Sequence, residues 1–391
     1  MLTIKYPLAT ETWDHAEYTA INNVIASGKF TMGDKVKEFE NNFSKFFNIK
    51  YSVMVNSGSS ANLLAIAALF YRKHNNLKAG DEIIVPAVSW STSYFPLYQY
   101  GLKLKFVDID IETLNYDIDS LKNAVSSNTK AILVVNLLGN PNDFDKINKI
   151  ISKQDIIIIE DNCESMGAEY NKQKTGTFGT VGTFSTFFSH HISTMEGGVV
   201  VTNDKEIYHI LLSLRSHGWT RHLPKENLIT GTKLDNAFEE SFKFVLPGYN
   251  VRPGELNGAI GVEQLKKLPA FVEKRRENAK IFVSLFKDNP NFYIQKEIEQ
   301  SSWFGFSLVI KPNSKLKRNK IIELLEKNNI EVRPIVAGNF TKNPVMKYFD
   351  KVIHNKLSNA DYISKNGFFV GNHHYDLTIN IQNLANLLNN Y

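Results

Sequence analysis

The sequence has one cysteine, Cys163, among 391 residues. A single thiol excludes intrachain disulfides, iron–sulfur clusters and zinc sites built on several cysteines, and it suits a reducing compartment. No apolar run reaches the roughly 18 residues that a membrane span needs. The first twenty residues lack the basic start and apolar stretch of a signal peptide. We therefore expect a cytoplasmic protein with no membrane partner.

Proline, glycine and net charge are also scarce. With 12 Pro and 22 Gly, the chain is neither collagen-like nor of low complexity. The 45 basic and 40 acidic residues leave a formal charge of +5, and the basic residues are spread along the chain. This pattern does not indicate nucleic-acid binding. An apolar content of 43% is ordinary for a globular protein, and the length predicts two domains at about 150 residues each.

Short apolar runs alternate with helical patterns between residues 50 and 160. Strands buried on both faces and alternating with helices are typical of an α/β fold with a mostly parallel sheet. Ligands of such sheets gather where the strands end. The expected strands are 51–55, 82–86, 105–109, 130–136 and 155–160, and the expected helices are 59–71, 90–98 and 120–125.

The pattern changes beyond residue 180. We expect an extended loop over 222–245 and a smaller α+β domain at the C-terminal end. The division is placed between a large domain, 1–265, and a small domain, 266–391. The expected strands are 183–188, 198–202, 303–310 and 331–335, and the expected helices are 204–216, 254–266, 269–287 and 318–328, with Pro269 separating the middle pair.

Two motifs follow expected strands. Small residues in 57–62 (SGSSAN) would let backbone N–H groups approach an anion at a helix N-terminus. The alternative is a simple N-cap by Ser57 or Ser59. Asp161 ends a buried strand, where a carboxylate is costly unless paired. Its partner could be a protonated pyridine nitrogen; otherwise Asp161 is a helix cap or a metal ligand.

A third motif, 185–198 (STFFSHHISTMEGG), contains the adjacent His190 and His191. One interpretation of such a pair is a solvated surface loop. A metal site is not expected here, because adjacent side chains diverge and no carboxylate or cysteine lies at ligand spacing.

Together with 33–40 (GDKVKEFE), 160–165 (EDNCES) and 247–253 (PGYNVRP), these motifs resemble the sugar aminotransferases of the DegT/StrS type over nearly the whole chain. The resemblance implies the aspartate-aminotransferase-like fold (fold type I), an intimate homodimer, and pyridoxal 5'-phosphate or pyridoxamine 5'-phosphate as cofactor. In that family a lysine holds the cofactor covalently. His190 occupies its position, and no lysine lies between Lys174 and Lys205.

The resemblance also implies roles for individual residues. Trp90 would stack on the cofactor ring, although core packing is the alternative. His217 and Arg221 would contact substrate, although a basic surface loop is the alternative. The implied cofactor-binding residues are Gly58, Ser59, Trp90, Asp161, Glu164, Ser185 and, from the neighbouring subunit, Asn250; the implied substrate-binding residues are His217, Arg221 and Arg252.

A branch of this family that carries the histidine acts as a dehydratase. The resemblance thus implies removal of the C3 hydroxyl from GDP-4-keto-6-deoxymannose, with L-glutamate re-aminating the cofactor. The product leads to 3,6-dideoxy sugars such as colitose in bacterial lipopolysaccharide (O-antigen). His190 would be the acid and base, because the usual histidine pKa of about 6.5 suits both roles. The alternatives are a nucleotide-sugar aminotransferase and a non-catalytic sugar-nucleotide-binding homologue.

Overall fold

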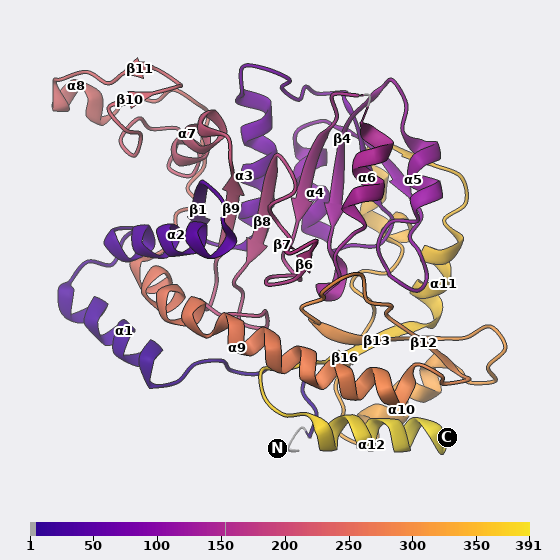
Figure 1. Ribbon diagram of the computed structural model, residues 1–391. Coiled ribbons are helices and arrows are strands. Elements are labelled where there is room, and N and C mark those ends of the chain that lie inside the picture. The colour runs from indigo at the N-terminus through magenta and orange to yellow at the C-terminus, as the bar shows by residue number, and fades with distance from the viewer. Residues whose placement is uncertain (1–4, 153) are drawn as a thin grey trace.

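An eight-stranded sheet forms the centre of the computed structural model, which describes residues 5–152 and 154–391 (Figure 1). Neighbouring strands from β8 to β15 are parallel, whereas β9 runs antiparallel to both of its neighbours. The predicted mostly parallel sheet is confirmed. In spatial order its strands are β1 (Tyr51–Val55), β9 (Gly198–Thr202), β8 (Val181–Ser185), β5 (Ile157–Asp161), β4 (Thr129–Val135), β2 (Glu82–Pro86), β3 (Lys103–Val107) and β15 (Lys351–Ile353).

Helices cover both faces of this sheet (Figure 1). Along β2, Ile83 and Val85 belong to one buried cluster, and Ile84 belongs to another. Burial on both faces explains why these strands read as unbroken apolar runs. The first cluster includes side chains of α3 (Gly58–Tyr71), α4 (Ser91–Gln99) and α7 (Lys205–Leu214), and the second includes side chains of α5 (Ile118–Ala124) and α6 (Phe144–Ile151).

The long helix α9 (Glu255–Phe286) runs below the sheet (Figure 1). The prediction of two helices separated at Pro269 is wrong, because α9 continues through this residue. Leu265, Leu268 and Val272 around the proline are buried with side chains of α2 (Asp34–Phe47). This packing offsets the backbone hydrogen bond that proline cannot donate.

A second, antiparallel sheet has the order β12-β13-β16-β14. Its core joins the C-terminal half of α9 to α10 and α12, as expected for the smaller α+β part. The remaining bounds are β12 (Phe292–Ile294), β13 (Gly305–Ile310), β14 (Val332–Arg333), β16 (Gly367–Gly371), α1 (His15–Ser27), α10 (Arg318–Lys327), α11 (Ser358–Asn366) and α12 (Thr378–Asn389), with a small hairpin of β6 (Glu169–Tyr170) and β7 (Gln173–Lys174) and three 3₁₀ turns, Leu137–Gly139, Phe340–Lys342 and Pro344–Tyr348.

The division between residues 265 and 266 stays a prediction. It falls inside α9, which crosses this point as one helix. From the C-terminal part, β15 pairs with β3 in the large sheet. Phe340 and Phe349 are buried in the core of that sheet. Segments of the expected small domain therefore complete the edge of the large one.

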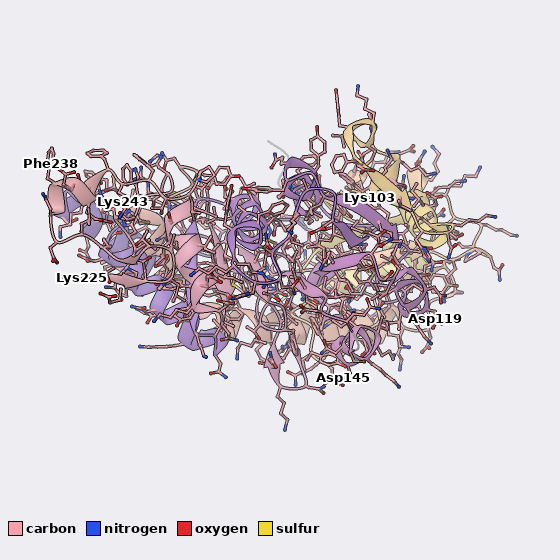
Figure 2. All side chains as sticks on the ribbon, turned by 90° about the horizontal axis from the view of Figure 1, so that it is seen from above. Lys103, Asp119, Asp145, Lys225, Phe238 and Lys243 are labelled. Carbon is pink, nitrogen blue, oxygen red and sulfur yellow. The ribbon has the colours of Figure 1, made fainter. Side chains whose placement is uncertain are left out.

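The segment 222–245 is more ordered than the extended loop that the sequence predicted. It contains the hairpin of β10 (Glu226–Asn227) and β11 (Gly231–Thr232) and the short helix α8 (Ala237–Ser241). It forms an arm at one end of the molecule, with Phe238 and Lys225 far from Asp119 and Asp145 (Figure 2). Among the helices of the described residues, none is long and apolar enough to cross a membrane.

Candidate active site

The N-terminus of α3 and the end of β8 lie in close contact. Ser57 caps α3, and its Oγ accepts from Ser60 N at 3.0 Å. A Cβ atom added to Gly58 would lie 2.7 Å from Ser185 Cβ and 3.2 Å from Cys163 Sγ, so glycine is required there. The N–H groups of Gly58 and Ser59 have no acceptor within the described residues. The helix end can thus receive an anion beside the Ser185 hydroxyl.

Asp161, at the end of β5, is buried with only neutral donors around it. Its Oδ2 accepts from Asn62 Nδ2 at 2.9 Å and from Ser93 Oγ at 2.7 Å, and its Oδ1 accepts from Cys163 N at 3.1 Å. The described part of the chain offers this carboxylate no lysine, arginine or histidine partner. A buried carboxylate favours a cation, and a protonated pyridine nitrogen has the required charge.

Glu164 follows on the same loop and is partly buried. Its Oε2 accepts from Leu138 N at 3.1 Å, where the backbone is left-handed with φ of +52°. Burial raises the pKa of Glu164 to about 7. The side chain can therefore gain or lose a proton near neutral pH.

His190 lies on the loop between β8 and β9. Its ring centroid is 5.9 Å from that of Phe187 and 5.2 Å from that of Phe304, and its Nδ1 is buried and has no hydrogen-bond partner among the described residues. Burial, together with the charge of Arg275, lowers the pKa of His190 to about 4. The expectation of an ordinary pKa is therefore wrong: His190 is a neutral imidazole at neutral pH, with a free ring nitrogen that can accept a proton but with lower basicity than an ordinary histidine.

The neighbouring His191 is fully buried, with Nε2 3.1 Å from the carbonyl oxygen of Ser302. The interpretation of the pair as a solvated loop is wrong for this residue. No group of metal-ligating side chains occurs in the ranges 5–152 and 154–391.

Trp90 is 58% exposed immediately before α4, so it is not a core residue. Its carbonyl oxygen accepts from Ser93 N at 3.1 Å, and Ser93 in turn contacts Asp161. The exposed indole therefore lies three residues before Ser93, a hydrogen-bond partner of Asp161, and is free to stack on a planar ligand.

Sequence reasoning missed the residues that hold Asp161. The sequence pattern places Asn62 only at the end of a small-residue motif and indicates no role for Ser93. Thr183 Oγ1 donates to Asn62 Oδ1 at 2.6 Å and fixes the amide orientation. A usable signal was present: Asn62 is a polar residue on a stretch of α3 that is otherwise apolar, and a buried polar group needs a partner.

The other expected residues gather around Trp219 rather than around Asp161. The Arg221 guanidinium lies 4.4 Å from the Trp219 ring and that of Arg252 lies 5.9 Å from it. The His217 ring is 4.8 Å from the same indole. Arg252 Nε donates to Asn250 Oδ1 at 3.0 Å. Within one chain these four residues form a second cluster, which we call the Trp219 cluster.

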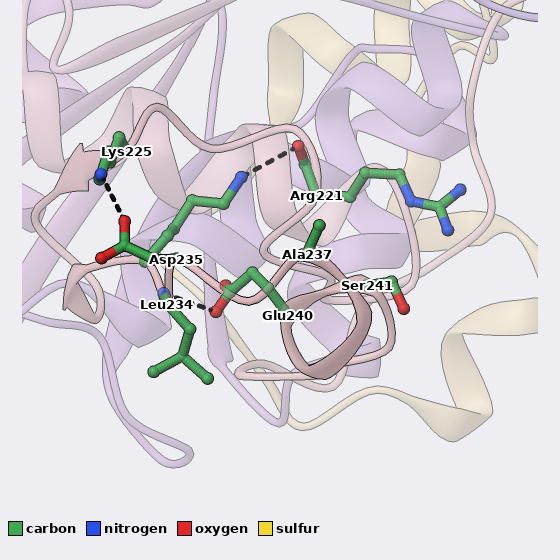
Figure 3. Close-up of a pocket in the computed structure, with 8 residues that line it drawn as sticks. Arg221, Lys225, Leu234, Asp235, Ala237, Glu240 and Ser241 are labelled. Carbon is green, nitrogen blue, oxygen red and sulfur yellow. Dashed lines mark hydrogen bonds and ion pairs between the residues drawn. The ribbon is translucent and has the colours of Figure 1, made fainter.

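A surface pocket of about 490 Å³ lies beside this cluster on the arm (Figure 3). Lys225 pairs with Asp235 at 2.6 Å, and Leu234 N donates to Glu240 at 3.0 Å. The Arg221 guanidinium points away from these groups (Figure 3). The residues that line this pocket include neither Asp161 nor any of its hydrogen-bond partners, so it is distinct from the Asp161 site.

Comparison with known proteins gives consistent results. Residues 11–382 match the model of the DegT/DnrJ/EryC1/StrS aminotransferase family. The chain is 63% identical over 386 residues to the GDP-4-keto-6-deoxy-D-mannose 3-dehydratase of Escherichia coli O55:H7, covering 98% of this chain and 100% of the relative. A solved structure of the E. coli enzyme with bound hydrated PLP matches with a TM-score of 0.98 and 63% identity, over 98% of this chain and 99% of that one.

A second solved structure is a GDP-4-keto-6-deoxymannose-3-dehydratase with a trapped PLP-glutamate geminal diamine. It matches with a TM-score of 0.97 and 62% identity, over 98% of this chain and 100% of that one. These likenesses confirm the expected fold type I. The chain belongs to the DegT/DnrJ/EryC1/StrS aminotransferase family.

Proposed function

We propose that this protein removes the C3 hydroxyl from GDP-4-keto-6-deoxy-D-mannose and forms GDP-4-keto-3,6-dideoxy-D-mannose. The observation that carries the proposal is His190 at the position of the family lysine. An imidazole has no primary amine with which to hold the cofactor covalently, but it can transfer protons. The 63% identity to the GDP-4-keto-6-deoxy-D-mannose 3-dehydratase of Escherichia coli O55:H7 supports the same substrate.

The residues around Asp161 fit pyridoxal phosphate. Gly58 and Ser59 of α3 and the Ser185 hydroxyl would bind its phosphate, because the helix end offers free N–H groups. Asp161 would pair with the ring nitrogen, since its carboxylate has only neutral partners. Trp90 would cover one face of the ring, and Glu164 would lie at its edge.

His190 supplies the proton transfers. Bound as the amine, the cofactor contributes the amino group that joins the sugar ketone and a ring that accepts electrons. Neutral His190 can take up one proton and then give it to the departing C3 hydroxyl, so that water leaves and the imidazole is neutral again. Oxidation of L-glutamate to 2-oxoglutarate, with release of ammonia, balances the loss of one oxygen atom from the sugar.

The Trp219 cluster would complete the site of a second subunit. Asn250 would reach the cofactor phosphate of the neighbour, and His217, Arg221 and Arg252 would contact its nucleotide sugar. The anionic diphosphate of such a substrate suits the two arginines. We therefore propose a homodimer, working in the cytoplasm on precursors of lipopolysaccharide sugars such as colitose.

The test is an incubation of the purified protein with PLP, L-glutamate and GDP-4-keto-6-deoxymannose, followed by mass spectrometry. The proposal requires a GDP-sugar with one oxygen atom less, together with 2-oxoglutarate. A sugar with an amine in place of its ketone would instead support the aminotransferase alternative. Absence of both products, with the substrate bound, would support the non-catalytic alternative.

A further inference from the structure

Arg275 on α9 is a buried arginine with no carboxylate partner in the described part of the chain. Its Nη1 donates to the carbonyl oxygen of Phe304 at 3.1 Å and to that of Asn372, and its buried Nε has no acceptor in residues 5–152 and 154–391. Carbonyl oxygens satisfy hydrogen bonds but bring no negative charge. Arg275 therefore places an uncompensated positive charge inside the protein, which is costly.

Phe304 connects this charge to the candidate catalytic histidine. Its carbonyl oxygen binds Arg275, and its ring lies 5.2 Å from the His190 ring and 5.7 Å from the His191 ring. The next residue of α9, Arg276, holds the same segment through Ser301 O at 2.9 Å. One side of the segment 301–304 is thus fixed by α9, and the other side packs against the histidine pair.

The charged groups that lower the pKa values of the histidine pair are basic. One carboxylate, Glu297, also binds the segment 301–304, where its Oε1 accepts from Ser301 N at 2.9 Å and from Trp303 Nε1 at 3.1 Å. His191 lies beside His190 on the same loop, and Arg275 and Arg276 face the pair from α9. The segment 373–375 faces Arg275 from the other side with His373, His374 and Tyr375. Burial and the charge of Arg275 both lower the pKa values of the histidines in this set.

We propose that Arg275 is a positioning residue for the dehydration. Its bond to Phe304 O holds the Phe304 ring against the His190 imidazole, and its buried charge adds to the effect of burial in favouring the neutral form of that imidazole. The reaction then starts with His190 as a base, also in mildly acidic solution. This inference rests on the proposed function only for its catalytic consequence, because the coupling between the two side chains is a property of the protein itself.

The test follows the protonation of His190 by NMR in the full-length protein loaded with PLP, without substrate. The His190 signal is assigned by its absence in His190→Asn. Arg275→Gln removes the charge but keeps a donor for Phe304 O, and Arg275→Met removes both. In either variant we expect the midpoint of the His190 titration to lie at a proton concentration about tenfold lower than in the parent. The acidic limb of the pH–rate profile of dehydration should shift by the same factor.

Two controls separate charge from packing. Arg275→Lys keeps the charge and should leave the midpoint within about threefold of the parent proton concentration. Arg276→Met removes the adjacent arginine, which holds the same segment, and should not move the midpoint. An unchanged midpoint in Arg275→Gln and Arg275→Met would overturn the proposal, as would failure of both to fold. A shifted midpoint in a protein that does not dehydrate the sugar would refute the proposed function but leave the coupling intact.

Discussion

A Cβ atom on Gly58 would lie only 2.7 Å from Cβ of Ser185, so α3 and β8 approach as closely as glycine allows. Gly58→Ala should therefore push the helix end away from Ser185. We expect a loss of about 1–3 kcal/mol in unfolding free energy and weaker binding of PLP, measured by fluorescence titration. The double variant Gly58→Ala/Ser185→Gly should recover most of the stability, since it removes the atom that the new methyl group meets. Equal stability of Gly58→Ala and the parent would contradict this packing.

Asn62 should matter for the protein before any ligand binds. Asn62→Leu removes the donor to Asp161 Oδ2 and leaves a buried carboxylate with fewer partners, a cost of about 1–3 kcal/mol. Chemical denaturation of the cofactor-free protein measures it. Thr183→Val is the matched control, because Thr183 contacts Asn62 and not the Asp161 side chain. Its effect should be the smaller of the two, and the opposite order would count against the assigned network.

His190 determines whether the cofactor can be fixed covalently. The ring nitrogens of imidazole lack the second proton that a primary amine loses on forming an imine, so borohydride should leave no cofactor attached to the parent protein. His190→Lys should become labelled, with a gain in mass seen by mass spectrometry, and should lose dehydration. His190→Asn should keep cofactor binding and slow dehydration by about 10²–10⁴-fold. Dehydration by His190→Asn near the parent rate would move the acid–base role to another residue.

The sequence predicted the sheet because strands that are buried on both faces consist of nearly unbroken runs of apolar residues, which are visible in the chain. It failed where distant packing decides the outcome. A proline inside a helix usually kinks or breaks it. At Pro269, however, the packing of Leu268 and Val272 against α2 keeps α9 continuous. The strand β15 reads as part of the C-terminal domain, and only its pairing with β3 shows where it lies.

The candidate site shows the same limits. The motif around His190 and the strand-end position of Asp161 are visible in the chain, so both could be named. The low pKa of His190 could not, because it depends on burial and on Arg275, 85 positions later. The donors Asn62 and Ser93 reach Asp161 from two different helices, and no local pattern links them to it.

The buried His373 should make stability depend on pH. Its pKa is lowered to about 4, mainly by burial, whereas the unfolded chain has the usual value of about 6.5. Between pH 6.5 and pH 4 the unfolded state binds a proton that the folded state does not bind. The stabilisation of the folded state linked to His373 is therefore fully present above pH 6.5 and is lost as the pH falls toward 4. His373→Gln should flatten this decline by on the order of 1–3 kcal/mol, measured by urea denaturation across that range.

The control for this measurement is His15→Gln on α1, where the side chain is exposed. It should keep the pH dependence of the parent. Glu160 has a pKa raised to about 7 by burial, and its contribution has the opposite sign, since the folded state holds that proton longer. This contribution is common to all three proteins and cancels in the comparison. Identical slopes of unfolding free energy against pH for His373→Gln and the parent would contradict the expected cost of burying His373.

The proposed subunit arrangement predicts complementation between two inactive variants. His190→Asn disables the proton transfer of its own site, and Asn250→Ala, on the proposed model, disables the phosphate contact of the neighbour's site. A mixed dimer then has one site with both changes and one site with neither. After unfolding and refolding of an equal mixture, random pairing should restore about a quarter of the parent activity. If Asn250 served its own chain, each site of the mixed dimer would carry one change and no activity would return; sedimentation of a fully active monomer would refute the dimer altogether.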